Sequence, residues 1–431
     1  MGYLKLWQLQ RPCLDQYDVI FIDEAQDCTP AIMDIMLPQR CGKVLVGDPH
    51  QQIYLFRGAV NALHLVEHTH LFYLTQSFRF GSEIAYIGAT ILQVCKKVTN
   101  ILVGGKQDGV IQGKAVDSLH PMTSGSSLGQ GKLAVLSRCN VTVFDQAVRL
   151  TDANPRCRLH IVGGVDNFGL DRIMDIWVLM QPENSRSRGI RDQFIRRFTK
   201  ESLGGYMGLK LYATKTEDRE LEAKFTVVEK YNSRIPELVD RIYSCTEREA
   251  QHADFILGTV HKSKGLEFDT VIVTDDFAKV PCAAHDLPRI SSYSGGDVQE
   301  DEWNLLYVAV TRAKNSLVIT KNISNVLTLA GEYFLRTELT QALLTEGQPP
   351  VCSVRECQNH ITTDWPLAMC KLPFKYIDSW DNGGPMCGAC VLQRVGPTAS
   401  LLAPPGSLQV LPVTLQRLEL PINHALLMAL F

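Results

Sequence analysis

The sequence lacks a long hydrophobic run, a secretion signal and a large excess of charge of one sign. No window of about 18 apolar residues occurs among its 431 residues, so no transmembrane helix and no membrane partner are predicted. The N-terminal stretch MGYLKLWQLQRP has no apolar core of the kind found in signal peptides. The net charge of −3 excludes a wholly basic nucleic-acid coat, although a local basic groove remains compatible with it.

Cysteine is present in an odd number, 13, in a chain that is 45% hydrophobic and 21% charged. An odd count in a large chain without a signal peptide favours a reducing compartment over a disulfide scaffold. The length predicts about three domains with a sizeable core. Five of the cysteines lie between Cys352 and Cys390, and this clustering requires an explanation of its own.

The hydrophobic pattern predicts an α/β fold with a helical insertion. Short β-branched or aromatic runs, typical of buried parallel strands, occur at 19–22, 44–46, 71–74, 133–136, 159–162, 255–259, 270–274 and 316–320. Helical spacing occurs at 82–97, 142–151 and 302–314, and through much of 168–250. Strands, a helical interval and further strands indicate a helical domain inserted in an α/β domain. Residues 123–131 and 395–413 are expected to be exposed connections.

An acidic segment, Asp23-Glu24-Ala25-Gln26-Asp27, directly follows the predicted strand VIFI. A carboxylate pair at the end of a strand suits Mg²⁺ binding by one member and polarisation of a water molecule by the other. The alternative is a solvated acidic turn.

A second segment, residues 47–59 (GDPHQQIYLFRGA), also follows a predicted strand. Gln51 is placed to sense a phosphate or orient water. Tyr54 and Phe56 could present rings to unstacked bases, each stack contributing about 1–3 kcal/mol. The alternative is that these rings belong to the core.

Together these segments resemble motifs II and III of superfamily-1 helicases of the UvrD/Rep type, and further motifs follow in order. LTQSFRFGSEI (74–84) resembles motif IV, LAVLSRCN (133–140) the segment beside it, and residues 161–164 the strand after that. LGTVHKSKGLEFDTVIV (257–273) matches motif V, and EWNLLYVAVTRAK (302–314) matches motif VI. GYLKLWQL before DEAQDCTPAIMDI, the helical insertion and the cysteine-bearing tail resemble vertebrate F-box DNA helicases.

The resemblance implies RecA-like P-loop NTPase motor domains. The expected layout is part of a first motor domain (1–75), a second motor domain (76–140 with 251–325), a helical insertion (141–250) and a tail (326–431). It implies an ATP-driven 3′→5′ DNA translocase in the nucleus that acts in homologous recombination and repair under replication stress. Its expected partners are single-stranded DNA, recombination proteins and, through an F-box absent here, a ubiquitin ligase.

The resemblance also implies a role for each matching residue. Asp23 would hold Mg²⁺, Glu24 would activate water, and Gln51 would contact the γ-phosphate of ATP. Arg79 and Arg312 would act as arginine fingers, because a guanidinium forks onto phosphate oxygens. The remaining assignments place Phe78, Gly265 and Glu267 at the nucleotide, and Tyr54, Phe56, Arg138, Thr259 and His261 at the DNA.

A phosphate-binding loop of the form GxxxxGK[ST] does not occur in the sequence. Gly-Lys pairs at 42, 105, 113 and 131 are followed by Val, Gln, Ala and Leu. In the family this loop precedes the strand at 19–22, so we expect a chain that starts partway through its first motor domain. Such a chain would not hydrolyse ATP at a helicase rate and would expose apolar surface.

The tail carries the spacing of a zinc site. Cys352-x4-Cys357 and Cys387-x2-Cys390 are separated by 29 residues, and Gly383, Gly384 and Gly388 allow tight turns at the second pair. We predict a zinc-ribbon-like segment over 352–390, with His360 and Cys370 as alternative ligands and unliganded thiols as the competing interpretation. A basic run at 186–200 suits either phosphate contact or a solvated helix face.

Overall fold

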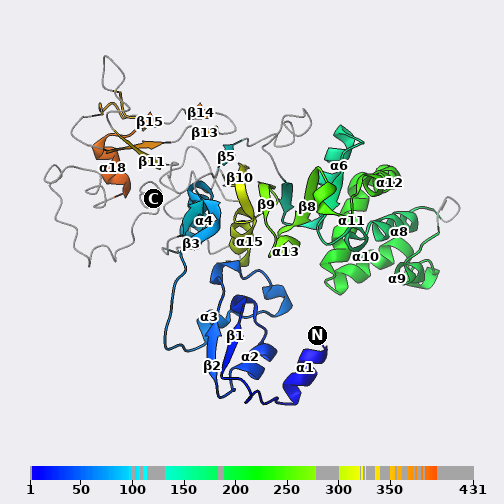
Figure 1. Ribbon diagram of the computed structural model, residues 1–431. Coiled ribbons are helices and arrows are strands. Elements are labelled where there is room, and N and C mark those ends of the chain that lie inside the picture. The colour runs from blue at the N-terminus through cyan, green and yellow to red at the C-terminus, as the bar shows by residue number, and fades with distance from the viewer. Residues whose placement is uncertain are drawn as a thin grey trace. The chain divides into compact units, whose positions relative to one another are not determined.

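The computed structural model divides the chain into two compact units, Met1–Val116 with Ala278–Phe431, and Asp117–Phe277 (Figure 1). It describes residues 2–96, 98, 102–106, 110–113, 132–182, 189–277, 300–320, 322–323, 326, 335–339, 350–354, 357–361, 367–371, 374–375, 380–381 and 384–395. Within these ranges, no helix has the length and apolar character needed to cross a membrane. The predicted connections at 123–131 and at 396–413 fall outside the described residues.

The first unit opens with a small α/β layer. Its elements are α1 (Gly2–Leu9), β1 (Val19–Ile22), η1 (Ala25–Asp27), α2 (Pro30–Met36), β2 (Gly42–Leu45), η2 (Pro49–Gln51), η3 (Leu55–Arg57) and α3 (Ala62–Leu65). β1 and β2 pair in parallel with Val19 opposite Gly42. Thr29 caps α2 by accepting a hydrogen bond from the Ile32 amide, and Pro30 takes the first helical position. The strand predicted at 19–22 is confirmed, and the one at 44–46 begins two residues earlier.

The sequence predicts that both faces of these strands are buried, but the structure leaves one face exposed. Ala25, Cys28 and Ala62 form a core beneath the layer, but Val19, Phe21 and Val44 are exposed, Phe21 by 73%. The expectation of exposed apolar surface therefore agrees with the structure. The strand predicted at 71–74 is also wrong, because these residues are irregular and exposed, and the next strand begins only at Gln76 where its partner strand starts.

The rest of the first unit joins segments from both ends of the chain. β3 (Gln76–Gly81) runs parallel to β4 (Val103–Lys106) and leads into α4 (Ser82–Lys96), while β5 (Val110–Gly113) runs parallel to β10 (Ala313–Ile319). α15 (Glu300–Val310) packs against α4. The helix predicted at 302–314 ends at Val310, so Arg312 lies in the short turn before β10.

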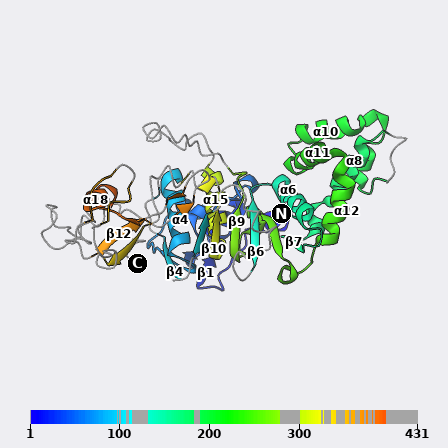
Figure 2. The same cartoon turned by 90° about the horizontal axis from the view of Figure 1, so that it is seen from above.

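The tail of the first unit contains short antiparallel pieces and one helix. β11 (Leu335–Leu339) pairs with β12 (Leu367–Lys371), and β12 pairs with β15 (Gly384–Pro385). β13 (Phe374–Lys375) pairs with β14 (Trp380–Asp381), and α18 (Gly388–Val395) follows β15. Figure 2 shows α18 beside β12.

The second unit contains a parallel sheet in which β6 lies between β9 and β8, and β7 follows β8. Its strands are β6 (Leu133–Ser137), β7 (Leu159–Ile161), β8 (Phe255–Thr259) and β9 (Phe268–Val273). The predicted strands at 133–136, 159–162, 255–259 and 270–274 are thereby confirmed within one or two residues. α6 (Asn140–Ala153) connects β6 to β7 along the chain and packs against β6 and β8. α13 (Val260–Ser263) follows β8.

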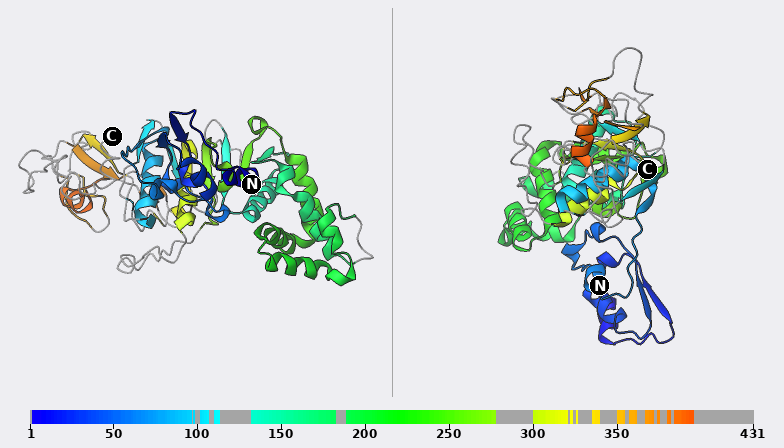
Figure 3. Two further views of the ribbon diagram at one scale, coloured as in Figure 1. Left: turned by 90° about the horizontal axis from the view of Figure 1, so that it is seen from below. Right: turned by 90° about the vertical axis from the view of Figure 1, so that its left-hand side faces the viewer.

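A cluster of helices separates β7 from β8 along the chain, as the sequence predicts (Figure 3). It comprises α7 (Val165–Phe168), α8 (Leu170–Met180), α9 (Gln193–Arg197), η5 (Glu201–Leu203), α10 (Gly205–Lys215), α11 (Arg219–Tyr231), η6 (Asn232–Arg234), α12 (Ile235–Cys245) and η7 (Ala250–His252). α12 buries Ile235, Leu238, Val239 and Ile242, the three- and four-residue spacing of one helix face. The exact domain boundaries predicted above remain a prediction.

Candidate nucleotide site

The acidic segment forms a sharp turn at the end of β1. Glu24 has φ 51° and ψ 43°, a left-handed conformation that costs a non-glycine residue roughly 1–2 kcal/mol. Its amide donates to Asp23 Oδ1 at 2.9 Å. Both carboxylates are exposed, whereas the next two residues, Ala25 and Gln26, are buried. The turn thus anchors its backbone while presenting two acidic groups to solvent, which suits a hard cation.

Gln26 locks this turn to the segment that follows β2. Its side chain is 1% exposed, its Nε2 donates to the Glu24 carboxylate, and its Oε1 accepts from the Asp48 amide at 3.1 Å. A Cβ placed on Gly47 would lie 2.1 Å from Gln26 Oε1 and 3.0 Å from the Ala25 nitrogen. Glycine is therefore required at position 47, and Gln26 orients Glu24. The sequence analysis gave no role to Gln26, although it lies inside the acidic motif.

Asp48 is the centre of a hydrogen-bond network. Its Oδ1 accepts from the His50 amide at 2.9 Å, which caps η2. Its Oδ2 accepts from Gln51 Nε2 at 2.9 Å and from the Tyr307 hydroxyl at 3.2 Å. Burial first, and the neighbouring Asp48 carboxylate second, raise the pKa of Tyr307 well above its usual value, so this hydroxyl remains a donor. One carboxylate thereby links two segments 259 residues apart in sequence.

Gln51 connects this hydrogen-bond network to Arg312. Gln51 Oε1 accepts from Arg312 Nη2 at 3.2 Å, and Arg312 Nε donates to the Val308 carbonyl at 3.1 Å. Arg79 Nη1 donates to the Thr311 carbonyl at 3.0 Å, which brings the second predicted finger to the same turn. The structure therefore brings Gln51, Arg79 and Arg312 together.

Arg312 is a buried cation, 2% exposed. Burial, and then the charge of Arg79, lower the pKa of Arg312 to about 10, against the opposing influence of Tyr307, Glu24 and Asp48. The guanidinium remains protonated at neutral pH. Two positive groups in a poorly solvated place favour the arrival of an anion, and guanidinium groups match phosphate oxygens.

A second contact layer reinforces the junction between α15 and the loop after β2. Asn304 Oδ1 accepts from Lys96 Nζ at 2.7 Å, and Asn304 Nδ2 donates to the Gln52 carbonyl at 2.8 Å. His50 lies edge-on to Tyr307 with 6.4 Å between ring centroids. These polar groups on α15 were not identified from the sequence, because only the fold brings residues near 50 and near 304 into contact.

A pocket of about 350 Å³ adjoins the two carboxylates. Its lining combines three acidic residues with apolar side chains of β1 and α2: Ile20, Phe21, Ile22, Asp23, Glu24, Asp27, Cys28, Ile32 and Met36. None of these nine residues is basic. The pocket therefore suits a cation beside its acidic rim and does not suit a bare phosphate.

The aromatic residues after this site are accessible. Phe56 is 65% exposed, and its ring centroid lies 6.2 Å from that of Tyr54. The Arg57 guanidinium lies 4.9 Å from the Tyr54 ring centroid and 5.4 Å from that of Phe56. The core alternative is wrong for Phe56, which can meet a base. Phe78 is likewise exposed.

The second unit holds the remaining predicted residues at the carboxyl ends of neighbouring strands. Ser137 pairs with Thr259, so Arg138, Thr259 and His261 are brought to one edge of the sheet. The Arg138 amide donates to the Asp276 carboxylate at 3.0 and 3.1 Å. Ligands of open parallel sheets bind at this edge. Gly265, with φ 84°, and Glu267 are exposed in the loop that follows α13.

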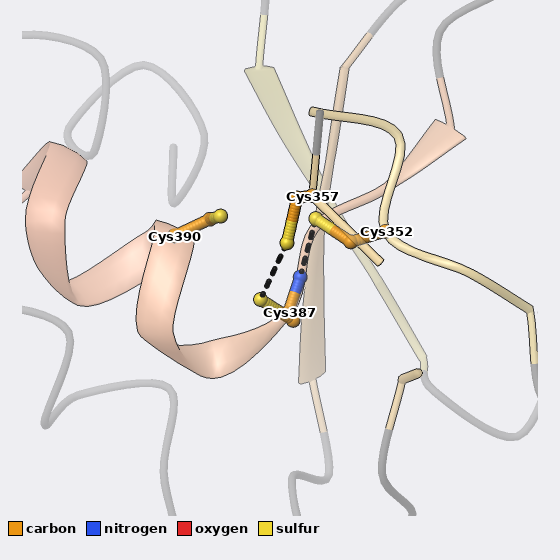
Figure 4. Close-up of side chains that lie close together, drawn as sticks. All are labelled: Cys352, Cys357, Cys387 and Cys390. Atoms are coloured by element: carbon orange, nitrogen blue, oxygen red, sulfur yellow. Dashed lines mark hydrogen bonds between the residues drawn. The ribbon is translucent and has the colours of Figure 1, made fainter. Parts of the chain in front are cut away.

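The four predicted zinc ligands lie together in the tail (Figure 4). The Sγ atoms of Cys352, Cys357, Cys387 and Cys390 all lie within 4.8 Å of one another. Within the described residues, this is the one group of cysteine, histidine or acidic side chains found with such spacing, and it does not include His360 or Cys370. The second pair opens α18, whereas a zinc ribbon would place a second turn there.

Two family models match the chain. Residues 5–70 match the UvrD/REP helicase N-terminal domain, and residues 212–324 match the UvrD-like helicase C-terminal domain. The first match contains Asp23, Glu24 and Gln51, and the second contains Thr259, Glu267 and Arg312.

Two curated relatives extend the match over most of the chain. F-box DNA helicase 1 of Gallus gallus is 49% identical over 419 residues, covering 96% of this chain and 40% of the relative. F-box DNA helicase protein 1 of Schizosaccharomyces pombe is 28% identical over 341 residues, covering 76% of this chain and 37% of the relative. The chain therefore spans about two fifths of the length of these relatives.

Proposed function

Since the chain belongs to the UvrD/Rep helicase family and is related to F-box DNA helicases, we propose that it is the motor part of an ATP-dependent helicase moving 3′→5′ along single-stranded DNA. The observation that carries the proposal is the hydrogen-bonded series Tyr307–Asp48–Gln51–Arg312. It connects the candidate phosphate sensor with a buried arginine from the opposite end of the chain.

The proposed chemistry is phosphoryl transfer to water. Asp23, exposed at the end of β1, would hold a Mg²⁺ ion, which would neutralise charge on the phosphates of ATP. Glu24, oriented by Gln26, would accept a proton from the attacking water. Arg79 and Arg312 would stabilise negative charge in the transition state, and Phe78, Gly265 and Glu267 would contact the nucleotide.

The same series offers a route from chemistry to movement. Gln51 is hydrogen bonded to both Asp48 and Arg312. A movement of Gln51 on loss of the γ-phosphate would therefore alter both hydrogen bonds. Tyr54 and Phe56 follow Gln51 within five residues, and in this proposal their rings would stack on bases close to the sensor along the chain. Arg138, Thr259 and His261 would follow the DNA backbone at the sheet edge of the second unit.

The wider role proposed is nuclear, in recombination and in repair under replication stress. The relatives' printed names support two parts of this proposal, the DNA helicase activity and the F-box. In a protein with an F-box, a ubiquitin ligase would be a partner, and recombination proteins on single-stranded DNA would be the targets.

A second candidate is a non-catalytic DNA- or partner-binding protein. It is favoured by the lack of GxxxxGK[ST] in these 431 residues, because the sensor and fingers act only on a nucleotide already held in line. On this alternative the chain binds DNA but cannot complete hydrolysis.

The test compares ATP hydrolysis, with and without single-stranded DNA, for the 431-residue chain and for the chain preceded by the phosphate-binding segment of a UvrD-type relative. We expect negligible turnover for the first and DNA-stimulated turnover for the second, abolished by Glu24→Gln and depressed by Arg312→Ala. An exposed-site control outside the basic run, Arg219→Ala, should leave turnover unchanged. A longer protein that folds and binds DNA but never hydrolyses ATP would contradict the motor and favour the alternative.

DNA binding is measured in parallel on the 431-residue chain. Binding should favour single strands and weaken with added salt, since released counterions drive it. Replacing both Tyr54 and Phe56 by Ala should raise the Kd at least tenfold if each ring contributes about 1 kcal/mol or more. Unchanged affinity in a folded double variant would remove the stacking role.

A further inference from the structure

The sulfur geometry of the tail cluster matches a single tetrahedral metal ion. Cys357 Sγ and Cys387 Sγ lie 3.8 Å apart, and all four sulfurs lie within 4.8 Å of one another. A tetrahedral ion with metal–sulfur bonds of about 2.3 Å places its sulfurs about 3.8 Å apart. The structure contains no disulfide among these four cysteines, and the 3.8 Å between Cys357 Sγ and Cys387 Sγ is longer than a sulfur–sulfur bond.

Two separate pieces of chain present these sulfurs. Cys352 and Cys357 lie on a turn in which the Cys352 amide donates to the Asn359 carbonyl at 2.8 Å and the Cys357 amide donates to the Val354 carbonyl at 3.0 Å. Cys387 immediately precedes α18, and Cys390 lies in its first turn. Figure 4 shows the Cys390 sulfur directed from α18 toward the other three.

Backbone bonds hold the two pieces in register. The Ser353 amide donates to the Pro385 carbonyl at 2.8 Å, and the Ser353 hydroxyl donates to the Gly384 carbonyl at 2.7 Å. Gly384 has φ 118°, which a side chain rarely adopts, and a Cβ there would meet Ser353 Cβ at 3.3 Å. The approach of the cysteine pairs is thus built into the backbone.

The surroundings of the sulfurs suit thiolates. The Cys387 amide donates to Cys352 Sγ at 3.2 Å, and Asn359 Nδ2 donates to Cys387 Sγ at 3.4 Å. Such donors characterise the outer shell of metal–thiolate sites. Cys352 and Cys387 are only 6% and 5% exposed, so negative charge on this cluster requires a cation beside it.

We propose that Cys352, Cys357, Cys387 and Cys390 bind one structural Zn²⁺ ion as a closed tetrathiolate site. Four soft sulfur ligands in tetrahedral array select zinc among the common metals, and a fourth protein ligand leaves no position for a substrate. A cluster of several irons between the same sulfurs would hold them farther apart. The proposal concerns the tail alone and does not depend on ATP hydrolysis.

The ion would stabilise the tail. The described elements of the tail are short. Besides the cysteines, the apolar side chains buried within the described part of the tail from β11 onward are Ile361, Ala368, Met369, Met386 and Val391. Small modules with so little core are commonly held by metals or disulfides. Zinc binding and folding of this segment would therefore be one event, and a chelator would unfold it.

The test begins with metal analysis of the full chain, purified in reducing buffer without chelator. One zinc per chain is expected, with four sulfurs at about 2.3 Å from the zinc by X-ray absorption. Cys357→Ser and Cys390→Ser should each bring bound zinc close to zero, whereas Cys13→Ser, at an exposed cysteine outside the cluster, should retain it.

If a cluster variant does not fold, Co²⁺ added to the zinc-depleted native chain gives the answer. The expected spectrum is that of tetrahedral, sulfur-bound cobalt, discharged by one equivalent of Zn²⁺. The proposal is overturned by less than about 0.2 equivalents of zinc after Zn²⁺ has been supplied, by iron in its place, or by nitrogen or oxygen in the ligand shell.

Discussion

Replacing Arg312 by Met tests whether the buried Arg312 cation destabilises the ligand-free site and whether a phosphate ligand would offset that cost. Methionine is apolar, unbranched and of similar length, so the change removes the charge with little change in packing. The variant Arg312→Met should make the ligand-free structure around α15 more stable, although it should abolish function.

The magnitude follows from three contributions. The fall in the pKa of Arg312 from 12.5 to about 10 corresponds to about 3 kcal/mol against the buried cation. The sign is that of a cation disfavoured by folding, so this cost is present at every pH below about 10. The variant recovers it but loses the hydrogen bonds to Val308 and Gln51, each contributing about 1 kcal/mol. Counting these two hydrogen bonds alone, a net stabilisation of about 1 kcal/mol remains.

Hydrogen exchange detected by mass spectrometry measures this change in local stability, on peptides from α15 and from residues 49–52. Exchange of α15 amides should slow about fivefold in Arg312→Met, and not in the exposed control Arg197→Met. Added inorganic pyrophosphate should slow exchange in the wild-type chain and have no effect in Arg312→Met. Faster exchange in the variant without any ligand would refute the reasoning, because it would mean that the cation stabilises its own site.

Two further predictions concern the turn and the second unit. Gly47→Ala should destabilise the 24–51 region by about 1–3 kcal/mol, because its Cβ would displace Gln26. The control Gly42→Ala should cost less, because its Cβ would meet its neighbours at 3.4 Å or more. Hydrogen exchange of peptides from residues 24–51 measures both effects, and equal effects would contradict the role of Gln26. Burial, and then Cys245, raise the pKa of Cys157 to about 12, so the unfolded thiol loses its proton near pH 9 while the folded one keeps it. The free energy of unfolding of this unit should therefore fall as pH rises from 9 toward 12. Denaturant titrations at several pH values measure this fall, and it should be smaller in Cys157→Ala. An equal fall in wild type and variant would exclude Cys157 as the cause of the pH dependence.

Much of the architecture follows from hydrophobic periodicity, because the strands of the second unit and the helices between them have the regular spacing that burial imposes. The same criterion failed at residues 71–74, where four apolar residues are irregular and exposed and pair with no strand that the structure describes. An apolar run specifies a strand only where the fold supplies a neighbour for it. β1 differs, because it pairs with β2 and yet leaves Phe21 in solvent, so pairing alone does not bury both faces of a strand.

The site was predictable where a function needs a particular chemical group at a motif position. The resemblance assigned Gln51 to the γ-phosphate of ATP and Arg312 to an arginine finger, and the structure shows the two side chains hydrogen bonded to each other. Asp48 and Tyr307 were not, because their importance depends on a contact between residues 259 apart in sequence. The cysteine cluster was predictable from spacing, since few arrangements other than metal ligation bring two close pairs together.

The β1–β2 ribbon has a consequence for the lifetime of this chain in a cell. Among the described strands, β1 and β2 pair only with each other. Exposed valine and phenylalanine side chains beside open strand edges are features that molecular chaperones bind and that promote strand-to-strand association. The steady-state amount of such a chain is governed by competition between recapture and degradation rather than by the stability of its well-packed parts. Substituting charged residues at Phe21 and Val44, which are exposed, would be expected to lengthen its half-life while leaving the helical cluster of the second unit unchanged.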